Sequence, residues 1–172
     1  AESRRSSADA FRKKAPGRFA KLTQGVTHYQ WLGRVRGPVV VCIHGLTTPS
    51  PVWYAIAQGL AGLGYRVLVY DLYGRGFSDA PRGPQTGDFF ARQLSDLLEH
   101  QELEDDVTLM GYSMGGSIAT HFTAKYPDRV RRMILLASGG AWLREDKLTE
   151  FCRKTPFAGD WGHAVIAAGK DR

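Results

Sequence analysis

Apolar runs without polar alternation recur along the second part of the chain: VVVCI at 39–43, YRVLVY at 65–70, VTLM at 107–110 and MILLA at 133–137. Such runs are typical of strands that are covered on both faces, as in a parallel sheet. Ahead of them, FAKLT and VTHYQWL flank a turn at Gln24-Gly25 and predict an antiparallel hairpin at one edge. The pattern therefore predicts a mostly parallel sheet that begins with a hairpin.

The segments between these runs have helical periodicity. Ser50-Pro51 is a typical helix start, and the apolar positions after it recur at helical spacing: Trp53, Ile56, Ala57, Leu60 and Ala61. A second stripe falls within residues 89–98, and a third helix is expected from about Ser113 to Lys125, where Tyr126-Pro127 ends it. Strands that alternate with helices indicate a doubly wound α/β domain with helices on both faces and right-handed crossovers.

Length and charge refine this prediction. The 172 residues, 43% of them hydrophobic, suit one globular domain. Of the net charge of +6, residues 1–36 carry nine basic and two acidic side chains, and the remaining residues carry fourteen and fifteen. We interpret residues 1–18 as a basic flexible arm. Because no groove-reading motif accompanies the basic residues, nucleic acid is not an expected partner.

No run approaches the roughly 18 to 20 apolar residues that a membrane span requires, and the first residues lack the apolar centre of a secretory signal. We therefore expect a cytoplasmic protein without a membrane span. Cys42 and Cys152 show no metal-ligand spacing, so free thiols, no metal site and no cofactor are expected.

The stretch GYSMGG at 111–116 directly follows the third apolar run, where a strand should turn into a helix. A serine hydroxyl becomes an effective nucleophile when a sharp strand-to-helix turn presents it to a base. Gly111 and Gly115 would let the crowded backbone segments approach each other. The amide of Met114, in the first helical turn, would point its positive end at a developing oxyanion. Ser113 is therefore the candidate catalytic residue.

Two further stretches at strand ends accompany it, IHGL at 43–46 and DLYGRGFSD at 71–79. Together the three motifs resemble those of the α/β-hydrolase fold family, with its G-x-S-x-G nucleophile elbow, its His-Gly oxyanion loop and its D-x-x-G-x-G-x-S loop. The resemblance implies a three-layer α/β core over residues 19–140, incomplete at the C-terminus. It also implies that Ser113 is the nucleophile and that the amides of Leu46 and Met114 form the oxyanion hole.

The other motif residues receive lesser roles. His44 is interpreted first as a structural histidine that holds the oxyanion loop, with pocket lining as its second role. Thr47, Tyr112 and Trp142 are the other candidates for the substrate pocket. Asp71 and Ser78 are expected to bond within their own loop, to which Gly74 and Gly76 give the freedom to bend.

A serine hydrolase of this family also needs an acid and a base, and both should follow Ser113 in the chain. His121 lies eight residues along the same helix, about 12 Å away at 1.5 Å per residue, which is too far for a hydrogen bond. His28 belongs to the hairpin and His100 closes a helix. His163 is the only downstream candidate base, and its segment reads equally as part of a helical cap over residues 141–172.

Two functions stay open. The first is a serine hydrolase that cleaves an ester or related activated carbonyl of a small, mainly apolar substrate, whereas dehalogenases and epoxide hydrolases place an aspartate where Ser113 stands. The second is a non-catalytic hydrolase-like scaffold, receptor or inactive fragment, because the acid and base are missing. We also expect a missing C-terminal segment or a second chain to cover the edge of the last strand, since an unpaired edge invites aggregation.

Overall fold

Residues 12, 13 and 15–139 are described by the structure, a computed structural model. The candidate cap at 141–172, with Trp142, Cys152 and His163, lies outside these residues, as does most of the basic arm. Within the described part no helix combines the length and apolar character that a bilayer crossing requires.

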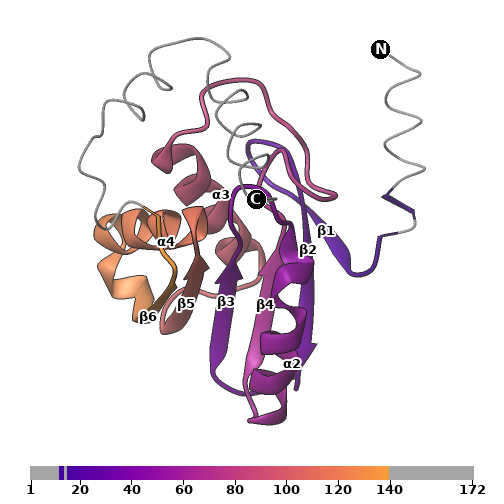
Figure 1. The fold of residues 1–172 in the computed structure, drawn as a ribbon, viewed down its shortest axis with the longest axis vertical. Helices are drawn as coiled ribbons and strands as arrows, with labels where there is room; N and C mark the ends of the chain where they lie inside the picture. The colour runs from indigo at the N-terminus through magenta and orange to yellow at the C-terminus, as the bar shows by residue number, and fades with distance from the viewer. Residues whose placement is uncertain (1–11, 14, 140–172) are drawn as a thin grey trace, which may run out of the picture. The chain divides into compact units, whose positions relative to one another are not determined.

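A six-stranded sheet in the order β1-β2-β4-β3-β5-β6 forms the centre of the fold (Figure 1). The hairpin consists of β1 (Arg18–Lys21) and β2 (Val26–Gly33), and β2 pairs antiparallel with β4. The other contacts, β4 with β3, β3 with β5 and β5 with β6, are parallel. This confirms the predicted mostly parallel sheet with an antiparallel N-terminal hairpin.

The parallel strands are β3 (Val39–Ile43), β4 (Arg66–Tyr70), β5 (Val107–Tyr112) and β6 (Val130–Leu136). The last two strands extend beyond their apolar runs, since β5 continues through Gly111 and Tyr112, and β6 begins three residues before Met133. Backbone pairing between β5 and β6 explains both extensions. Tyr112 of β5 stands opposite Leu136 of β6, and Arg132 of β6 stands opposite Thr108 of β5.

Three α-helices and two short 3-10 helices connect the strands. The 3-10 helices are η1 (Ser50–Trp53) and η2 (Pro127–Arg129). The α-helices are α2 (Tyr54–Gly62), α3 (Gly87–His100) and α4 (Met114–Lys125). The expected stripe on α2 is only partly right, because Trp53 and Ala57 are buried but Ile56 is exposed. A 3-10 turn advances by three residues instead of 3.6 and so shifts the phase of the positions that follow.

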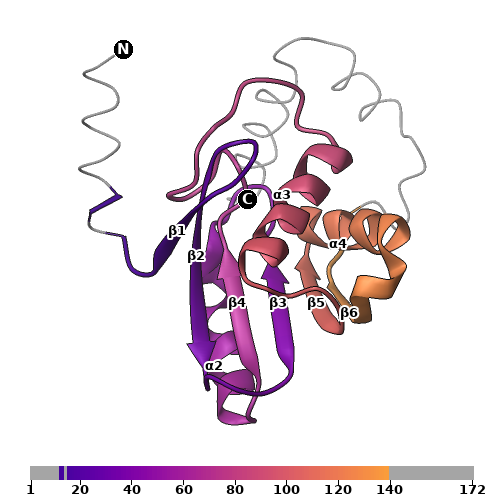
Figure 2. The ribbon, with the colours of Figure 1, turned by 180° about the vertical axis from the view of Figure 1, so that it is seen from behind.

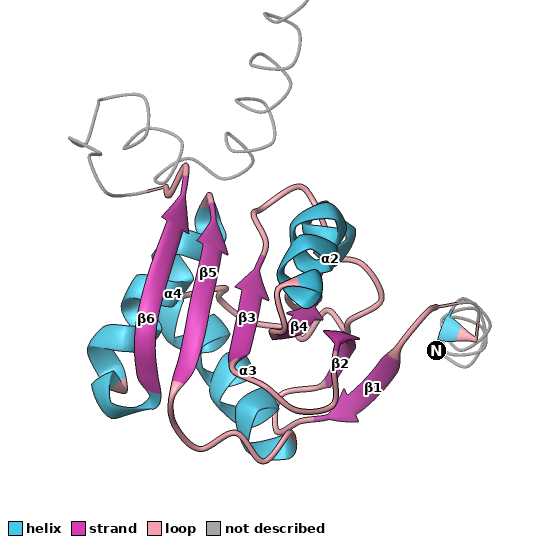
Figure 3. Cartoon of the chain, turned by 90° about the horizontal axis from the view of Figure 1, so that it is seen from below, coloured by secondary structure: helices cyan, strands magenta, loops and turns pink. Residues whose placement is uncertain are grey.

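Helices cover both faces of the sheet, with α3 and α4 on one side and α2 on the other (Figures 2 and 3). Alternate residues of the central strands therefore enter two separate cores. Val41, Ile43, Leu68 and Tyr70 pack on the side of α3, whereas Val40, Cys42, Val67 and Val69 pack on the side of α2. This explains why the strands lack polar alternation.

Strand β6 stands at the edge of the described sheet and pairs there with β5 alone. Met133, Ile134 and Leu135 are each between 37% and 40% exposed. The expectation that another segment or chain covers this edge stays a prediction.

Candidate active site

Ser113 lies at the sharp turn between β5 and α4, where it is the N-cap residue of the helix. Its φ of 53° and ψ of −120° are unfavourable for a residue with a side chain. The surroundings hold this conformation, because the Ser113 amide donates to the Leu136 carbonyl and its carbonyl accepts from Gly116 and Gly139, each at 3.0 Å. Its hydroxyl has no hydrogen-bond partner among residues 12–139 and its side chain is only partly buried. The hydroxyl is therefore available for a hydrogen bond to a group other than the described residues.

Two glycines make this turn possible by allowing backbone segments to touch. A β-carbon on Gly115 would lie 2.1 Å from the Ile43 carbonyl oxygen, at the end of β3. A β-carbon on Gly111 would lie 2.5 Å from the Gly115 carbonyl oxygen. No real β-carbon makes contacts this short. The G-x-S-x-G spacing is thus a packing requirement between β3, β5 and α4.

The loop after β3 lies directly against this turn. A β-carbon on Gly45 would be 3.2 Å from the Ser113 β-carbon. Leu46 and Thr47, which follow, are exposed. Among the described residues, neither the Leu46 amide nor the Met114 amide donates a hydrogen bond. Both candidate oxyanion donors are therefore free in this part of the chain.

His44 is fully buried, and both of its ring nitrogens are engaged. Nδ1 donates to the Gly45 carbonyl at 2.7 Å, and Nε2 accepts from the Leu72 amide at 2.9 Å. This pattern requires a neutral ring, and burial, the largest influence, lowers the pKa of His44 accordingly. The prediction that His44 lines a substrate pocket is not supported, because its ring has no accessible surface. Its contacts are those of a structural histidine that joins two loops.

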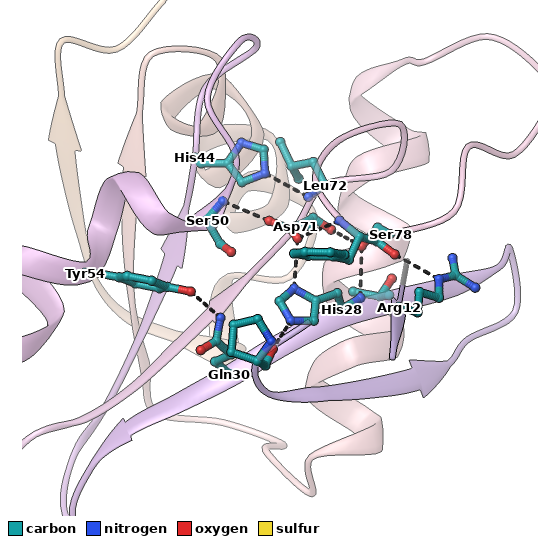
Figure 4. Close-up of polar contacts among 12 residues, drawn as sticks. Arg12, His28, Gln30, His44, Ser50, Tyr54, Asp71, Leu72 and Ser78 are labelled. Carbon is teal, nitrogen blue, oxygen red and sulfur yellow. Dashed lines mark hydrogen bonds and ion pairs between the residues drawn. The ribbon is translucent and has the colours of Figure 1, made fainter. Parts of the chain in front are cut away.

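Asp71, at the end of β4, is the centre of a buried network (Figure 4). Oδ2 accepts from His28 Nδ1 at 2.8 Å and from the Phe77 amide at 3.0 Å, and Oδ1 accepts from the Ser50 amide at 2.8 Å. Ser78 donates to the Asp71 carbonyl within the loop, as expected. Asp71 thus bonds within its own loop as predicted, through Phe77 and Ser78, and in addition it reaches β2 and η1.

His28 is paired as a cation in this network. Both ring nitrogens face acceptors, since Nδ1 contacts Asp71 and Nε2 contacts the Pro16 carbonyl. Burial alone would lower the pKa of His28, but the hydrogen bonds to Asp71 and Pro16 outweigh it and raise the pKa. Burial would raise the pKa of Asp71, but the hydrogen bonds from His28, Phe77 and Ser50 lower it. The side chain of a hairpin residue thus fixes the loop that follows β4.

This pair predicts how stability depends on pH. The His28 contribution is complete below its ordinary pKa of 6.5 and is lost as pH rises through its raised pKa. The Asp71 contribution is complete above its ordinary pKa of 3.8 and is lost as pH falls through its lowered pKa. We expect the free energy of unfolding in urea to decline above about pH 6.5, with a weaker decline in His28→Gln. The same decline in the variant would contradict the assignment.

Further contacts hold the loop of residues 71–79 against its neighbours. Gln93, buried on α3, donates to the Asp71 carbonyl and to Thr27, and accepts from the Tyr73 amide. Arg75 donates to the Leu46 carbonyl at 3.2 Å and to the Tyr73 carbonyl at 2.8 Å. Arg75 therefore connects this loop to the candidate oxyanion loop, a role that the sequence analysis missed.

An apolar cavity of about 290 Å³ borders the turn that carries Ser113. Its lining comes from η1, α2 and the ends of β5 and β6: Val52, Trp53, Ile56, Tyr112, Leu136 and Ala137. Tyr112 precedes Ser113, and the Leu136 carbonyl accepts from the Ser113 amide, so the cavity adjoins the turn. Of the predicted pocket residues, Tyr112 lines this cavity, Thr47 and His44 do not, and Trp142 lies outside the described residues.

The described histidines are all engaged away from Ser113 or exposed. His121 contacts Asp88 at 3.1 Å, and His100 is exposed at the end of α3. The candidate base His163 lies outside the described residues. Burial raises the pKa of the Cys42 thiol to about 12, so this cysteine is inert. Within the described residues no group of three or more potential ligands is placed to hold a metal ion.

Comparison with known proteins identifies the fold family. The family model described as alpha/beta hydrolase fold matches residues 38–160, well over half of the chain. The chain belongs to this family. The match contains the candidate oxyanion loop, the loop after β4 and the turn at Ser113, so the expected family resemblance is confirmed.

Individual relatives of this α/β-hydrolase chain include an uncharacterized protein of Mycobacterium tuberculosis, which is 36% identical over 60% of this chain and 30% of its own length. Lipase 1 of Psychrobacter immobilis is 33% identical over 64% of this chain and 34% of its own. Among solved structures, an esterase from Exiguobacterium antarcticum is 27% identical with a TM-score of 0.66, over 71% of this chain and 45% of that one. The chain thus spans about a third of the length of these curated relatives.

Proposed function

We propose that this α/β-hydrolase chain is part of a serine hydrolase that cleaves an ester or related activated carbonyl through an acyl-enzyme on Ser113. The observation that carries the proposal is the conformation of Ser113, at φ 53° with its hydroxyl unengaged among the described residues. Strain of this kind is typical of functional sites, where the rest of the fold maintains it.

The chemistry would proceed in two steps. The Ser113 oxygen attacks the carbonyl carbon while its proton passes to a base, and the amides of Leu46 and Met114 donate to the oxyanion that forms. The tetrahedral intermediate then expels the alcohol, which takes the proton. Water attacks the acyl-serine in the second step and restores the hydroxyl, with release of the acid. Among the described residues no histidine is within hydrogen-bond reach of the Ser113 hydroxyl, so the base remains to be identified.

The lining of the cavity beside the turn is the support for proposing a small, mainly apolar substrate. Its walls are aliphatic and aromatic, and no charged side chain lines it. A carboxylesterase-like or lipase-like reaction fits this lining, and the esterase and lipase among the relatives agree with it. Epoxide hydrolases also occur among the structural neighbours. Ser113 disfavours that chemistry, because the resemblance implies an aspartate at this position in such enzymes.

A fluorophosphonate probe, which phosphonylates activated serines, tests the proposal in the full-length protein. We expect labelling of the wild type and its loss in Ser113→Ala, because that substitution removes the proposed nucleophile. Ser117→Ala is the matched control, since Ser117 lies one turn along α4 and bonds to the Gly139 carbonyl. This variant should label like the wild type.

Two outcomes would contradict the proposal. A folded wild-type protein that does not react would favour the alternative of a non-catalytic module. Undiminished labelling of Ser113→Ala would place the reactive group elsewhere.

A further inference from the structure

A basic surface lies at the end of the described sheet opposite Ser113. Two loops form it, residues 34–38 between β2 and β3 and residues 63–65 between α2 and β4. They pack together, because the Arg66 amide donates to the Pro38 carbonyl at 2.9 Å and a β-carbon on Gly37 would lie 2.5 Å from the Gly64 carbonyl oxygen. Both loops precede parallel strands, whereas Ser113 follows one. They are at the bottom of Figure 1.

The basic surface carries the most exposed large hydrophobic side chains of the described residues. Val35 is 87% exposed and Leu63 is 77% exposed. Neither belongs to the cores, and each stands on one of the two packed loops. Single exposed aliphatic residues are ordinary on a surface. Here, however, Val35 stands directly between two arginines, Arg34 and Arg36.

Four arginines lie close to Val35 in the chain or in the same groove: Arg34 and Arg36 flank it in sequence, and Arg18 and Arg66 line the groove that it lines. Within the described residues none of them forms an ion pair. Residues 12–36 contain no aspartate or glutamate at all. The charge of this surface is therefore not neutralised by the fold.

Three of the four arginines, Arg18, Arg34 and Arg66, line a groove of about 510 Å³ together with Tyr29, Trp31 and Val35. The Arg66 guanidinium stacks on Trp31 at 4.5 Å from the ring centroid, which positions the cation. Guanidinium groups bind phosphate through paired N–H donors, and a stacked guanidinium loses little freedom when it does so. The groove therefore suits a phosphate group.

Acidic side chains limit the surface on one side. The loop from α3 to β5 carries Glu102, Glu104, Asp105 and Asp106, and it borders the groove where Trp31 donates to Gln101. Asp106 pairs with Arg131. None of these acids lines the groove, so an anionic surface that contacts the groove and the two packed loops does not have to pack against them.

We propose that this basic surface docks on an anionic phospholipid bilayer. The arginines contact headgroup phosphates, and Val35 and Leu63 enter the boundary between headgroups and acyl chains. Basic residues close to an anionic leaflet and small apolar insertions act together in such docking. Ser113 would face away from the bilayer, so docking anchors the protein without placing its turn in the lipid.

Co-sedimentation with phosphatidylcholine vesicles that contain about one-third phosphatidylglycerol tests this proposal. Removing the charges of Arg34 and Arg36 together, as Arg34→Gln with Arg36→Gln, should weaken vesicle partitioning about 25-fold, since each basic side chain contributes roughly fivefold. Val35→Ser with Leu63→Ser should weaken it as well. Partitioning should be lost on pure phosphatidylcholine.

Matched controls remove two charges elsewhere. The first control combines Arg82→Gln with Arg132→Gln, because neither arginine lines the groove. The second control combines Arg4→Gln with Arg5→Gln and tests whether the basic N-terminal residues contribute to binding. Both pairs should retain most of the partitioning, and fluorophosphonate labelling of Ser113 should be unchanged in every variant. Loss of vesicle binding would therefore count against docking alone, and loss of labelling would count against the proposed hydrolase function alone.

Equal loss of partitioning in the controls and in the Arg34 and Arg36 variant would overturn the docking proposal, as would the absence of binding by the wild type at low salt. Tighter binding of duplex DNA than of vesicles, lost in the same variant, would make the surface a nucleic-acid site instead and would also overturn it.

Discussion

Gly115→Ala should destabilise the fold by about 3 kcal/mol and abolish fluorophosphonate labelling of Ser113. The new β-carbon would lie 2.1 Å from the Ile43 carbonyl oxygen and 2.6 Å from the His44 carbonyl oxygen. Both atoms belong to backbone in or next to the central strand β3, which cannot move aside like a flexible side chain. Helix α4 must therefore shift, and the Met114 amide shifts with it. Urea denaturation measures the first effect and the probe measures the second.

Gly59→Ala is the control for this prediction. Gly59 lies within α2, and nothing is within 4 Å of the position that its β-carbon would take. The same substitution should therefore stabilise the protein by about 0.5–1 kcal/mol, because alanine favours helix. Equal effects of the two substitutions would show that close packing at Gly115 is not the cause.

Asp71→Asn should cost about 3–5 kcal/mol of stability, the range typical of a buried ion pair that loses one partner. The carboxylate accepts from His28, Phe77 and Ser50, and an amide of the same shape must turn its NH₂ group toward one of these donors. Because the Leu72 amide next to Asp71 bonds to His44, labelling of Ser113 should fall as well. Urea denaturation at pH 6 and the probe reaction measure the two effects.

Asp88→Asn provides the comparison on the surface. Asp88 pairs with Lys125 at 2.8 Å and with His121, but it is exposed, so solvent screens both interactions and only a small change is expected. A double-mutant cycle of Asp71→Asn with His28→Gln isolates the pair itself. Additive effects in that cycle would refute the coupling between β2 and the loop.

Much of the fold could be predicted because parallel strands are buried on both faces and leave unbroken apolar runs. The run at residues 39–43 coincides with β3. The ends of β5 and β6 were less predictable, because Gly111, Tyr112 and Arg132 do not read as buried strand. Backbone pairing between these two strands includes them regardless of side-chain polarity. Pairing depends on a neighbour, which no local pattern reveals.

The candidate site, like the fold, was predictable from the sequence only in part. The position of Ser113 could be predicted, because the G-x-S-x-G spacing is a local signal, even though the backbone that Gly115 approaches, at Ile43, lies far away in the sequence. The partnership of His28 with Asp71 could not, because 43 residues separate them and a histidine in a hairpin carries no mark of its partner. The contact of Arg75 with Leu46 spans 29 residues and was missed for the same reason. The acid and base that the resemblance implies stay a prediction, because the candidate base His163 lies outside the described residues.

The backbone at residue 113 also has an evolutionary consequence. Glycine adopts this positive φ without a steric penalty, so a glycine at residue 113 would raise the stability of the folded chain while removing the hydroxyl. Under the proposed function, a single Ser113→Gly substitution would exchange the nucleophile for a more stable turn. The serine that this chain carries is then a sign that selection has favoured reactivity over stability at this position.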